Sequence, residues 1–418
     1  MERVKGTRDF YPEEMEVQNY LFSVWKKVAV SFGYKEMEGP ILESEEIYRK
    51  SGEEIPQQTY SLIDKSGRKL VLRPELTPTL ARMIQQRKDL SKPIKWFSMP
   101  RCFRYEAPQL GRLREFFQFN IDCLGSESMI ADAEIIVTAV EIMKKFKLTE
   151  KDFYVRISNR KITQSFLNSL NIKNIQEVSR LIDKKDKIGQ ENFFLSLRGC
   201  GLEKDQVTKL YKFLAVKDIE SLKEYCQDDL GKTGLEELSS LFDYLKKFNI
   251  SKYCRLDLSI MRGFDYYTST VFEVFDANGT YRAIAGGGRY NNLAGIPGVG
   301  YGMGDVVLEL FLKSKNKLKV KNLEKKVYII YIGDKALIQS VKAAEKLRKF
   351  CIVELDVMNK GLSKQLSYAD QIKADYAILI GTDELKKKKL RLRDMKTGKE
   401  TPLNLEQICK FLSKVNSS

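Results

Sequence analysis

The segment RCFRYEAPQLGRLREFFQFNIDC, residues 101–123, decides the fold, because both of its ends alternate in polarity with the period of a β-strand. A loop rich in Pro and Gly, which carries Arg112 and Arg114, joins the two ends. The segment therefore predicts two antiparallel strands. On the first strand, Arg104 and Glu106 alternate with aromatic residues, so we expect both charged side chains on one face.

The returning strand places four alternate side chains on one face: Phe116, Gln118, Asn120 and Asp122. Such a face is not an ordinary core, because burying polar groups without partners is costly. It is either the wet side of an amphipathic hairpin or the wall of a polar pocket. The spacing favours a pocket for a nucleoside triphosphate, in which Arg binds phosphates, an aromatic ring stacks on the base and Glu accepts from an exocyclic amine.

Upstream, Arg73-Pro74-Glu75-Leu76-Thr77-Pro78 follows a strand pattern and permits two interpretations. Glu75 and Thr77 at a strand end can bind an ammonium group by charge and hydrogen bond. Alternatively, the segment is the start of a helix, with Thr77 as its N-cap and Glu75 near the helix dipole.

Three glycine-containing segments follow downstream: RGFDYYT (262–268), AGGGRY (285–290) and GVGYGMG (298–304). Glycines in strands allow a ligand or a second backbone to approach closely. Residues 268–288 predict a hairpin that turns at Asn278-Gly279. The alternating glycines of 298–304 precede a helical run at 305–312, and their spacing does not fit a dinucleotide-binding fingerprint.

The rest of the chain predicts two domains. Residues 14–32 have the apolar period of a helix, residues 174–250 indicate an inserted helical module, and the Lys-rich stretch 313–326 indicates a linker. After the linker, strands and helices alternate, which favours a small α/β domain with a largely parallel sheet and LRLRDM (390–395) as an edge strand. Residues 326–418 hold half of the chain's net charge of +16, including KKKKLRLR at 386–393, so this domain is expected to bind a polyanion. The alternative for the basic run is a lysine-protected strand edge.

The chain of 418 residues contains no histidine. This excludes Ser-His-Asp triads, Cys-His dyads, His-containing zinc sites and an imidazole general base. The seven cysteines have no CxxC spacing, and they are expected to be reduced thiols of a cytoplasmic protein. The sequence shows neither an apolar run of membrane-spanning length nor a signal peptide at its start.

Together, and in this order, these motifs resemble those of the histidyl-tRNA synthetases, a family of class II aminoacyl-tRNA synthetases. Residues 14–40 resemble motif 1, residues 103–116 motif 2, and residues 262–267 and 286–290 the two histidine-specific signatures. The resemblance implies an α+β fold: a catalytic domain (1–325) with an antiparallel sheet flanked by helices and interrupted by the helical insertion 174–250, then an α/β anticodon-binding domain (326–418). It also implies a homodimer built through motif 1.

The resemblance further implies L-histidine, ATP, Mg²⁺ and tRNA(His) as ligands and substrates, and a histidyl-adenylate as intermediate. Arg104 and Arg262 match the family's catalytic arginines. The implied ATP-binding residues are Arg104, Glu106, Arg112, Phe116 and Arg262. The implied histidine-binding residues are Glu75, Thr77, Arg104, Gln118, Asp122, Arg262, Tyr266, Tyr267 and Tyr290.

One departure concerns motif 3, which usually ends in Gly-x-Glu-Arg with the Arg clamping an ATP phosphate. Here Asp305-Val306-Val307 follow Gly304, and no Arg appears through Leu312. Arg112, Arg114 and Arg289 are the candidates to replace it; the alternative is a subfamily that does without this clamp.

Two other functions are weighed against the synthetase. The first is a synthetase-like regulatory subunit of ATP phosphoribosyltransferase; such subunits usually lack the C-terminal domain and the Arg-Gly-x-Asp-Tyr-Tyr signature, and this chain has both. The second is a plain nucleic-acid-binding protein. The absence of histidine has two open explanations: an adaptation that lets the enzyme be translated when charged histidine tRNA is scarce, or a lysine-rich genome bias.

Overall fold

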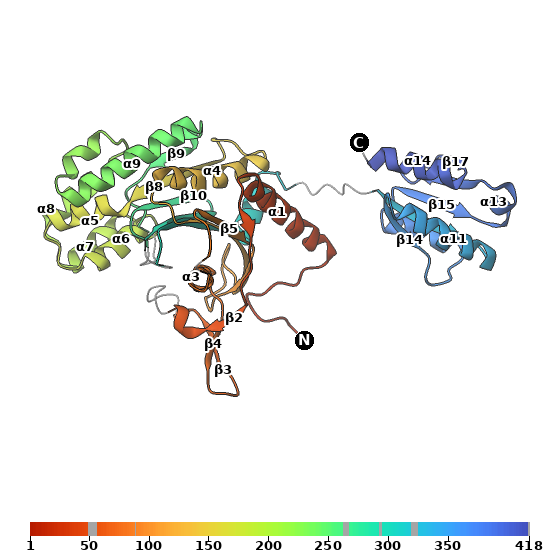
Figure 1. Cartoon of the computed structure of the whole chain (residues 1–418), viewed down its shortest axis with the longest axis horizontal. Coiled ribbons are helices and arrows are strands. Elements are labelled where there is room, and N and C mark those ends of the chain that lie inside the picture. Colours follow the sequence, from red (N-terminus) through yellow and green to blue (C-terminus); the bar gives the residue numbers. More distant parts are fainter. Residues whose placement is uncertain (49–56, 88, 262–266, 292–294, 319–324, 417–418) are drawn as a thin grey trace. The chain divides into compact units, whose positions relative to one another are not determined.

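The computed structural model describes residues 1–48, 57–87, 89–261, 267–291, 295–318 and 325–416. The chain divides into two compact units, Met1–Lys319 and Val320–Ser418, each with its own hydrophobic core (Figure 1). Among the described residues, no helix combines the length and the apolar character needed to span a bilayer. All seven cysteines are free thiols.

The first unit is built on a sheet in which nine strands are described. Neighbouring strands are antiparallel except at the two ends of the sheet, where β1 pairs with β5 and β8 with β9 in parallel. The antiparallel sheet expected from the sequence is therefore confirmed. In spatial order its strands are β1 (Lys35–Glu36), β5 (Ile94–Ser98), β7 (Glu115–Leu124), β12 (Gly298–Gly304), β11 (Ala285–Tyr290), β10 (Thr270–Asp276), β8 (Phe153–Asn159) and β9 (Cys254–Leu256), with β6 (Arg101–Phe103) paired to β7.

Helices cover one face of this sheet. Helix α4 (Met129–Lys145) contacts β7, β10, β11 and β12, and α1 (Pro12–Ser31) packs on α4. The apolar stripe of α1 is buried, and its Trp25 stacks on Phe119 of β7 with ring centroids 5.6 Å apart. Because side chains alternate along β7, Phe119, Ile121 and Cys123 enter this core while Gln118 and Asp122 face the other side.

Helices α5 (Arg160–Ser169), α6 (Ile175–Ile188), α7 (Gln190–Gly199), α8 (Lys204–Leu214) and α9 (Asp229–Lys247) gather at the β8–β9 end of the sheet (Figure 1). Helix α9 contacts α5, α4 and β8. The segment expected to be helical thus shares a continuous core with the sheet. A small separate antiparallel sheet has the order β2 (Leu42–Ser44), β4 (Lys69–Leu72) and β3 (Tyr60–Ile63). The 3-10 turn Glu45–Tyr48 follows β2, and α3 (Thr77–Gln85) follows β4.

Strands β10 and β11 form the predicted hairpin. Their connection is the loop 277–284, which contains the predicted Asn278-Gly279 turn, where the N–H of Gly279 donates to the carbonyl of Asp276. The carboxylate of Asp276 holds this loop by accepting the main-chain N–H groups of Asn278 and Tyr281, each at 2.7 Å. Helix α10 (Asp305–Ser314) follows the glycine strand β12, as the sequence predicts.

The second unit alternates strands and helices, and its sheet has the order β14-β13-β15-β16-β17. The first three strands are parallel and the last two are antiparallel, so the sheet is mixed rather than largely parallel. The prediction of LRLRDM as an edge strand is wrong, because β17 pairs outside β16; Pro402 in β17 lacks an N–H, which suits an edge. The elements are β13 (Lys326–Tyr331), α11 (Asp334–Leu347), β14 (Ile352–Leu355), α12 (Leu362–Gln371), β15 (Tyr376–Ile380), α13 (Thr382–Lys387), β16 (Leu390–Asp394), β17 (Glu400–Leu403) and α14 (Leu405–Asn416).

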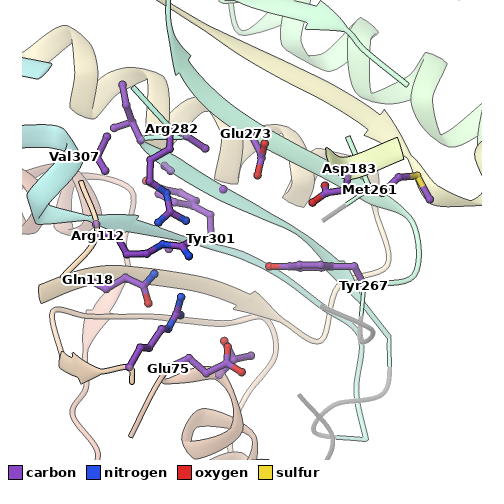
Figure 2. Close-up of a pocket in the computed structure, with 18 of the residues that line it drawn as sticks. Glu75, Arg112, Gln118, Asp183, Met261, Tyr267, Glu273, Arg282, Tyr301 and Val307 are labelled. Carbon is purple, nitrogen blue, oxygen red and sulfur yellow. The ribbon is translucent and has the colours of Figure 1, made fainter. Parts of the chain in front are cut away.

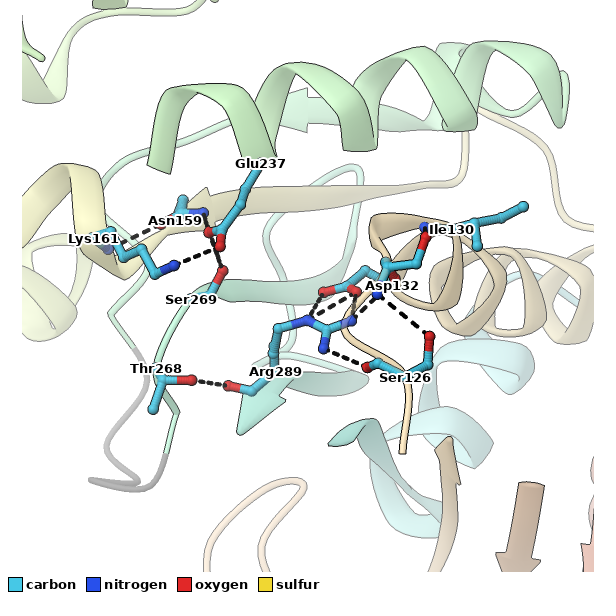
Figure 3. A network of polar contacts seen from close by, with 10 residues as sticks. Ser126, Ile130, Asp132, Asn159, Lys161, Glu237, Thr268, Ser269 and Arg289 are labelled. Carbon is cyan, nitrogen blue, oxygen red and sulfur yellow. Dashed lines mark hydrogen bonds and ion pairs between the residues drawn. The ribbon is translucent and has the colours of Figure 1, made fainter. Parts of the chain in front are cut away.

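A buried ion pair fixes β11 to the start of α4. Arg289 and Asp132 are 2% and 0% exposed, and the Nε of Arg289 donates to both carboxylate oxygens (Figure 3). The same guanidinium donates to the carbonyls of Ser126 and Ser128. Since every branch of Arg289 is engaged, this residue is a structural element of the sheet.

We predict that Arg289→Ala lowers the free energy of unfolding of the first unit by about 3–5 kcal/mol, because it leaves the Asp132 carboxylate buried without its cation. Both tryptophans of the chain, Trp25 and Trp96, lie in this unit, so urea unfolding followed by tryptophan fluorescence measures it selectively. The control is Arg87→Ala, which removes an exposed pair with Asp89 and is expected to cost no more than about 1 kcal/mol. Equal losses in the two variants would contradict the prediction.

Candidate active site

A cavity of about 800 Å³ opens on the face of the sheet opposite α4. The alternate side chains of β7 line it, as the sequence predicts for Phe116, Gln118, Asn120 and Asp122. All the proposed site residues that the structure describes line this one cavity: Glu75, Thr77, Arg104, Glu106, Arg112, Phe116, Gln118, Asp122, Tyr267 and Tyr290. Arg262 and Tyr266 lie outside the described residues.

The glycines of β12 make room for these side chains. In the β7–β12 register Gly300 stands opposite Asp122, and a Cβ on Gly300 would lie 2.1 Å from Oδ1 of Asp122. A Cβ on Gly302 would lie 2.5 Å from Nε2 of Gln118. Neither distance is sterically possible, so the Gly-x-Gly spacing of this strand is required by the side chains of its neighbour.

One group of cavity residues is acidic and phenolic. The hydroxyl of Tyr290 donates to Oδ1 of Asp122 at 2.7 Å, and both side chains are buried. Burial raises the pKa of Asp122 to about 7; the Tyr290 hydrogen bond opposes the shift and the nearby Glu75 adds to it. Asp122 also acts electrostatically on Tyr290, as Tyr267 does, so these side chains lie close together. A buried carboxylate whose pKa is raised in this way gains from a further hydrogen-bond donor, so Asp122 is suited to accept an N–H from a ligand.

Glu75 and Thr77 stand at the start of α3. The alternative interpretation of this segment is right about a helix start and wrong about the cap: α3 begins at Thr77 itself, its N-cap is Leu76, and no side chain caps it. Pro78 already removes one N–H that would need a partner. Buried Arg73 fixes the approach to this helix by donating to the carbonyls of Arg101 and Gly39. The Thr77 side chain is therefore not used for capping and lines the cavity.

A second group of cavity residues is basic. The guanidinium of Arg104 lies over the ring of Phe116, 5.3 Å from its centroid, and its Nε donates to the carbonyl of Pro74. The Nε of Arg112 lies 2.7 Å from Oε2 of Glu106, an ion pair without the alignment of a hydrogen bond. The strand predicted through Glu106 ends earlier, at Phe103, because the N–H of Tyr105 turns away to the carbonyl of Gln58.

The cavity also contains residues that the sequence analysis missed. Arg282 and Glu273 come from the β10–β11 hairpin, and both point into the cavity in Figure 2. Helix α6 contributes a further wall with Ser179, Arg180 and Asp183 among others. No local spacing marks these residues, because they join the site only through the pairing of β10 with β11 and the packing of the helical segment.

Two of the three candidates for the missing motif 3 arginine are engaged elsewhere. Arg289 is buried in its pair with Asp132. Arg114 donates to the carbonyls of Glu106 and Lys5 and lies over the ring of Tyr105. Only Arg112 of the three lines the cavity.

Within the part of the chain that the structure describes, no three His, Cys, Asp or Glu side chains are grouped as metal ligands. The carboxylates near the arginines are Glu106 and Glu273. This small donor set fits Mg²⁺ held mainly by substrate phosphates and water, rather than a metal in a cage of protein ligands.

The antiparallel sheet, the strand pair β6–β7 and the cavity that they line place the chain among the class II aminoacyl-tRNA synthetases. Comparison with known protein families identifies the family within this class. The sequence model of the family "Histidyl-tRNA synthetase" matches residues 6–302, and that of the "Anticodon binding domain" matches residues 326–415. The chain belongs to the histidyl-tRNA synthetase family.

Individual relatives match the chain over all or nearly all of its length. The chain is 38% identical to the histidine–tRNA ligase of Thermoplasma volcanium, covering 100% of this chain and 99% of that protein. It is 40% identical to that of Leptospira biflexa, covering 94% and 93%. Among solved structures, histidyl-tRNA synthetase from Nostoc sp. PCC 7120 superposes with a TM-score of 0.84 at 26% identity, covering 99% of each chain.

We predict that Asp122→Asn stabilises the empty protein at pH 8. The folded pKa of about 7 lies above the ordinary value of 3.8, so folding disfavours the ionised form. The penalty is complete above pH 7 and vanishes below the unfolded pKa, and three pKa units correspond to about 4 kcal/mol. The amide is neutral at every pH. Thermal unfolding should therefore show the variant more stable at pH 8 and the difference shrinking toward pH 4; a variant no more stable than the parent at pH 8 would contradict the prediction.

Proposed function

We propose that the protein attaches L-histidine to tRNA(His) in two steps at the expense of ATP. Full-length relatives named histidine–tRNA ligase support this function. The observation that carries it is the cavity itself, which joins an acidic and phenolic group around Asp122 to a basic group around Arg112. A small ligand with an N–H and an ammonium fits the first group, and a triphosphate fits the second.

Histidine would bind in the acidic group. Neutral imidazole has one N–H donor and one acceptor nitrogen. Asp122, oriented by Tyr290, would accept the N–H, while the hydroxyl of Tyr267, with Tyr266 nearby, would serve the other nitrogen. A side chain lacking either nitrogen leaves a buried polar group unpaired and is strongly rejected. The remaining acidic and polar residues, Glu75, Thr77 and Gln118, would bind the amino-acid ammonium group.

ATP would bind in the basic group, with its adenine between Phe116 and Glu106 and its outer phosphates near Arg112. Arg104 lies between the groups, because it stacks on Phe116 and donates to Pro74, the neighbour of Glu75. It would hold the histidine carboxylate against the α-phosphate, and Arg262 would assist as the second catalytic arginine. The two groups thus align the reactants, which is a large part of the catalysis of phosphoryl transfer.

In the first step a carboxylate oxygen of histidine bonds to the α-phosphorus while the bond to the bridging oxygen breaks and pyrophosphate leaves with its electrons. The nucleophile is already an anion, so no side chain has to remove a proton. In the second step a hydroxyl oxygen of the 3′-terminal ribose bonds to the histidyl carbonyl carbon, the bond from that carbon to the phosphate oxygen breaks, and AMP leaves, with an oxygen of the departing phosphate accepting the hydroxyl proton. A chain without histidine performs the first step by positioning and charge neutralisation, and in the second step the substrate's own phosphate is the base.

Mg²⁺ would enter with ATP and neutralise phosphate charge, with Glu273 as a described carboxylate near the arginines. The second unit would bind the tRNA anticodon, supported by its family match and by four exposed lysines, Lys386–Lys389. We further propose a cytoplasmic homodimer through the motif 1 segment, and residues 174–250 as a helical insertion in a catalytic domain that ends near residue 325.

The regulatory-subunit alternative is not better supported. A structure titled as an ATP phosphoribosyltransferase regulatory subunit/histidyl-tRNA synthetase from Bacillus halodurans superposes with a TM-score of 0.76, covering 91% of this chain, but at 22% identity this likeness shows the fold alone.

Histidine-dependent exchange of labelled pyrophosphate into ATP tests the proposed function. We expect exchange with L-histidine and charging of tRNA(His), and we expect Asp122→Ala to raise the KM for histidine at least roughly tenfold while the affinity for ATP is kept, since it removes a charged hydrogen bond. Histidine binding without exchange would instead indicate a regulatory subunit. Neither binding nor exchange would indicate a nucleic-acid-binding protein.

A further inference from the structure

Arg282 enters the cavity between the motif 2 loop and the first turn of α10. It belongs to the β10–β11 loop, far in the sequence from either segment. A Cβ placed on Gly111 would lie 3.1 Å from Cγ2 of Val307 and 3.8 Å from both Cγ and Cδ of Arg282. The stem of Arg282 and the side chain of Val307 therefore both lie against Gly111. Val307 is the position three residues after Gly304, where motif 3 usually carries its arginine.

The guanidinium of Arg282 points into the same space as that of Arg112 (Figure 2). No described residue forms a hydrogen bond or an ion pair with it. Its pKa is lowered by burial and then by the neighbouring cations Arg112 and Arg104, whereas Glu106 and Glu273 act in the opposite direction. Three arginines converge here, and one of them lacks a partner.

Arg282 stands in the empty protein without a partner of its own. The cations Arg112 and Arg104 repel its guanidinium and the carboxylates of Glu106 and Glu273 attract it, while the residue is exposed to solvent at the cavity wall. Each of the other two arginines is already held, Arg104 by the Pro74 carbonyl and Arg112 by Glu106. Arg282 is thus the guanidinium left available to an incoming anion, and its planar donors match phosphate oxygens.

We propose that Arg282 binds the outer phosphates of ATP and takes the place of the arginine that motif 3 lacks. The inference rests on the proposed function, because it requires ATP in this cavity. Arg282 then neutralises the negative charge that grows on the pyrophosphate as the bond to the α-phosphorus breaks, alongside Arg112. The β10–β11 loop supplies the cation, and Val307 with Gly111 leaves the space through which its stem passes.

The test compares Arg282→Ala with Arg282→Lys and with the control Arg87→Ala, which removes an exposed arginine on the surface of the same unit. Binding of ATP, adenosine and histidine to each full-length protein is measured by calorimetry, and pyrophosphate exchange is measured against ATP concentration. We expect Arg282→Ala to weaken ATP binding and lower kcat/KM for ATP roughly ten- to hundredfold. Adenosine and histidine should bind as in the parent, and Arg282→Lys should fall between.

ATP binding and exchange equal to those of Arg87→Ala would overturn the inference. So would equal losses for ATP and adenosine, since a phosphate contact cannot weaken adenosine. The proposed function fails separately: it is overturned if the parent protein itself shows no histidine-dependent exchange.

Discussion

The site depends on the absence of side chains along one face of β12. Gly300 and Gly302 stand where any Cβ would collide with Asp122 and Gln118 of the neighbouring strand. Glycine in a strand costs roughly 0.5–1 kcal/mol per residue relative to alanine. The opposite face offsets this cost, because Phe119 and Ile121 of β7 and Val299, Tyr301 and Met303 of β12 belong to the core beneath α4. One face of the sheet is therefore packed in the core, and the other face borders the cavity.

The cavity contains two electrostatic environments. Asp122 is desolvated and Glu75 acts on it, and both effects keep its pKa high. In the second environment Arg282 and its neighbours Arg112 and Arg104 carry three positive charges, against the two carboxylates of Glu106 and Glu273. Arg104 lies between the two environments. A carboxylate held by the first environment and a triphosphate held by the second would both reach Arg104. The first step, whose nucleophile is already charged, needs no imidazole from the protein.

Much of the site could be predicted from local alternation. The alternation of side chains along a strand placed Gln118, Asn120 and Asp122 on one face. The resemblance to a known family then assigned roles to individual residues. Arg282 and the engagement of Arg289 with Asp132 depend on contacts between segments distant in the sequence, which periodicity does not report. Strand β17 is instead a local hairpin partner of β16, and its four residues, one of them Pro402, give only a weak strand signal. Thr77 was ambiguous because the same residue types suit a helix cap and a ligand contact, and only Pro78 and the observed start of α3 decide between them.

The most direct test of this account is the affinity for histidine of Gly300→Ala, with Gly304→Ala on the same strand as its control. A Cβ on Gly304 meets no atom within 4 Å, whereas one on Gly300 displaces the Asp122 carboxylate. Calorimetry should show that Gly300→Ala binds histidine roughly a hundredfold more weakly or not at all, while Gly304→Ala retains the parent affinity. Histidine binding of equal strength in the two variants would contradict the claim that the glycine strand creates the histidine site.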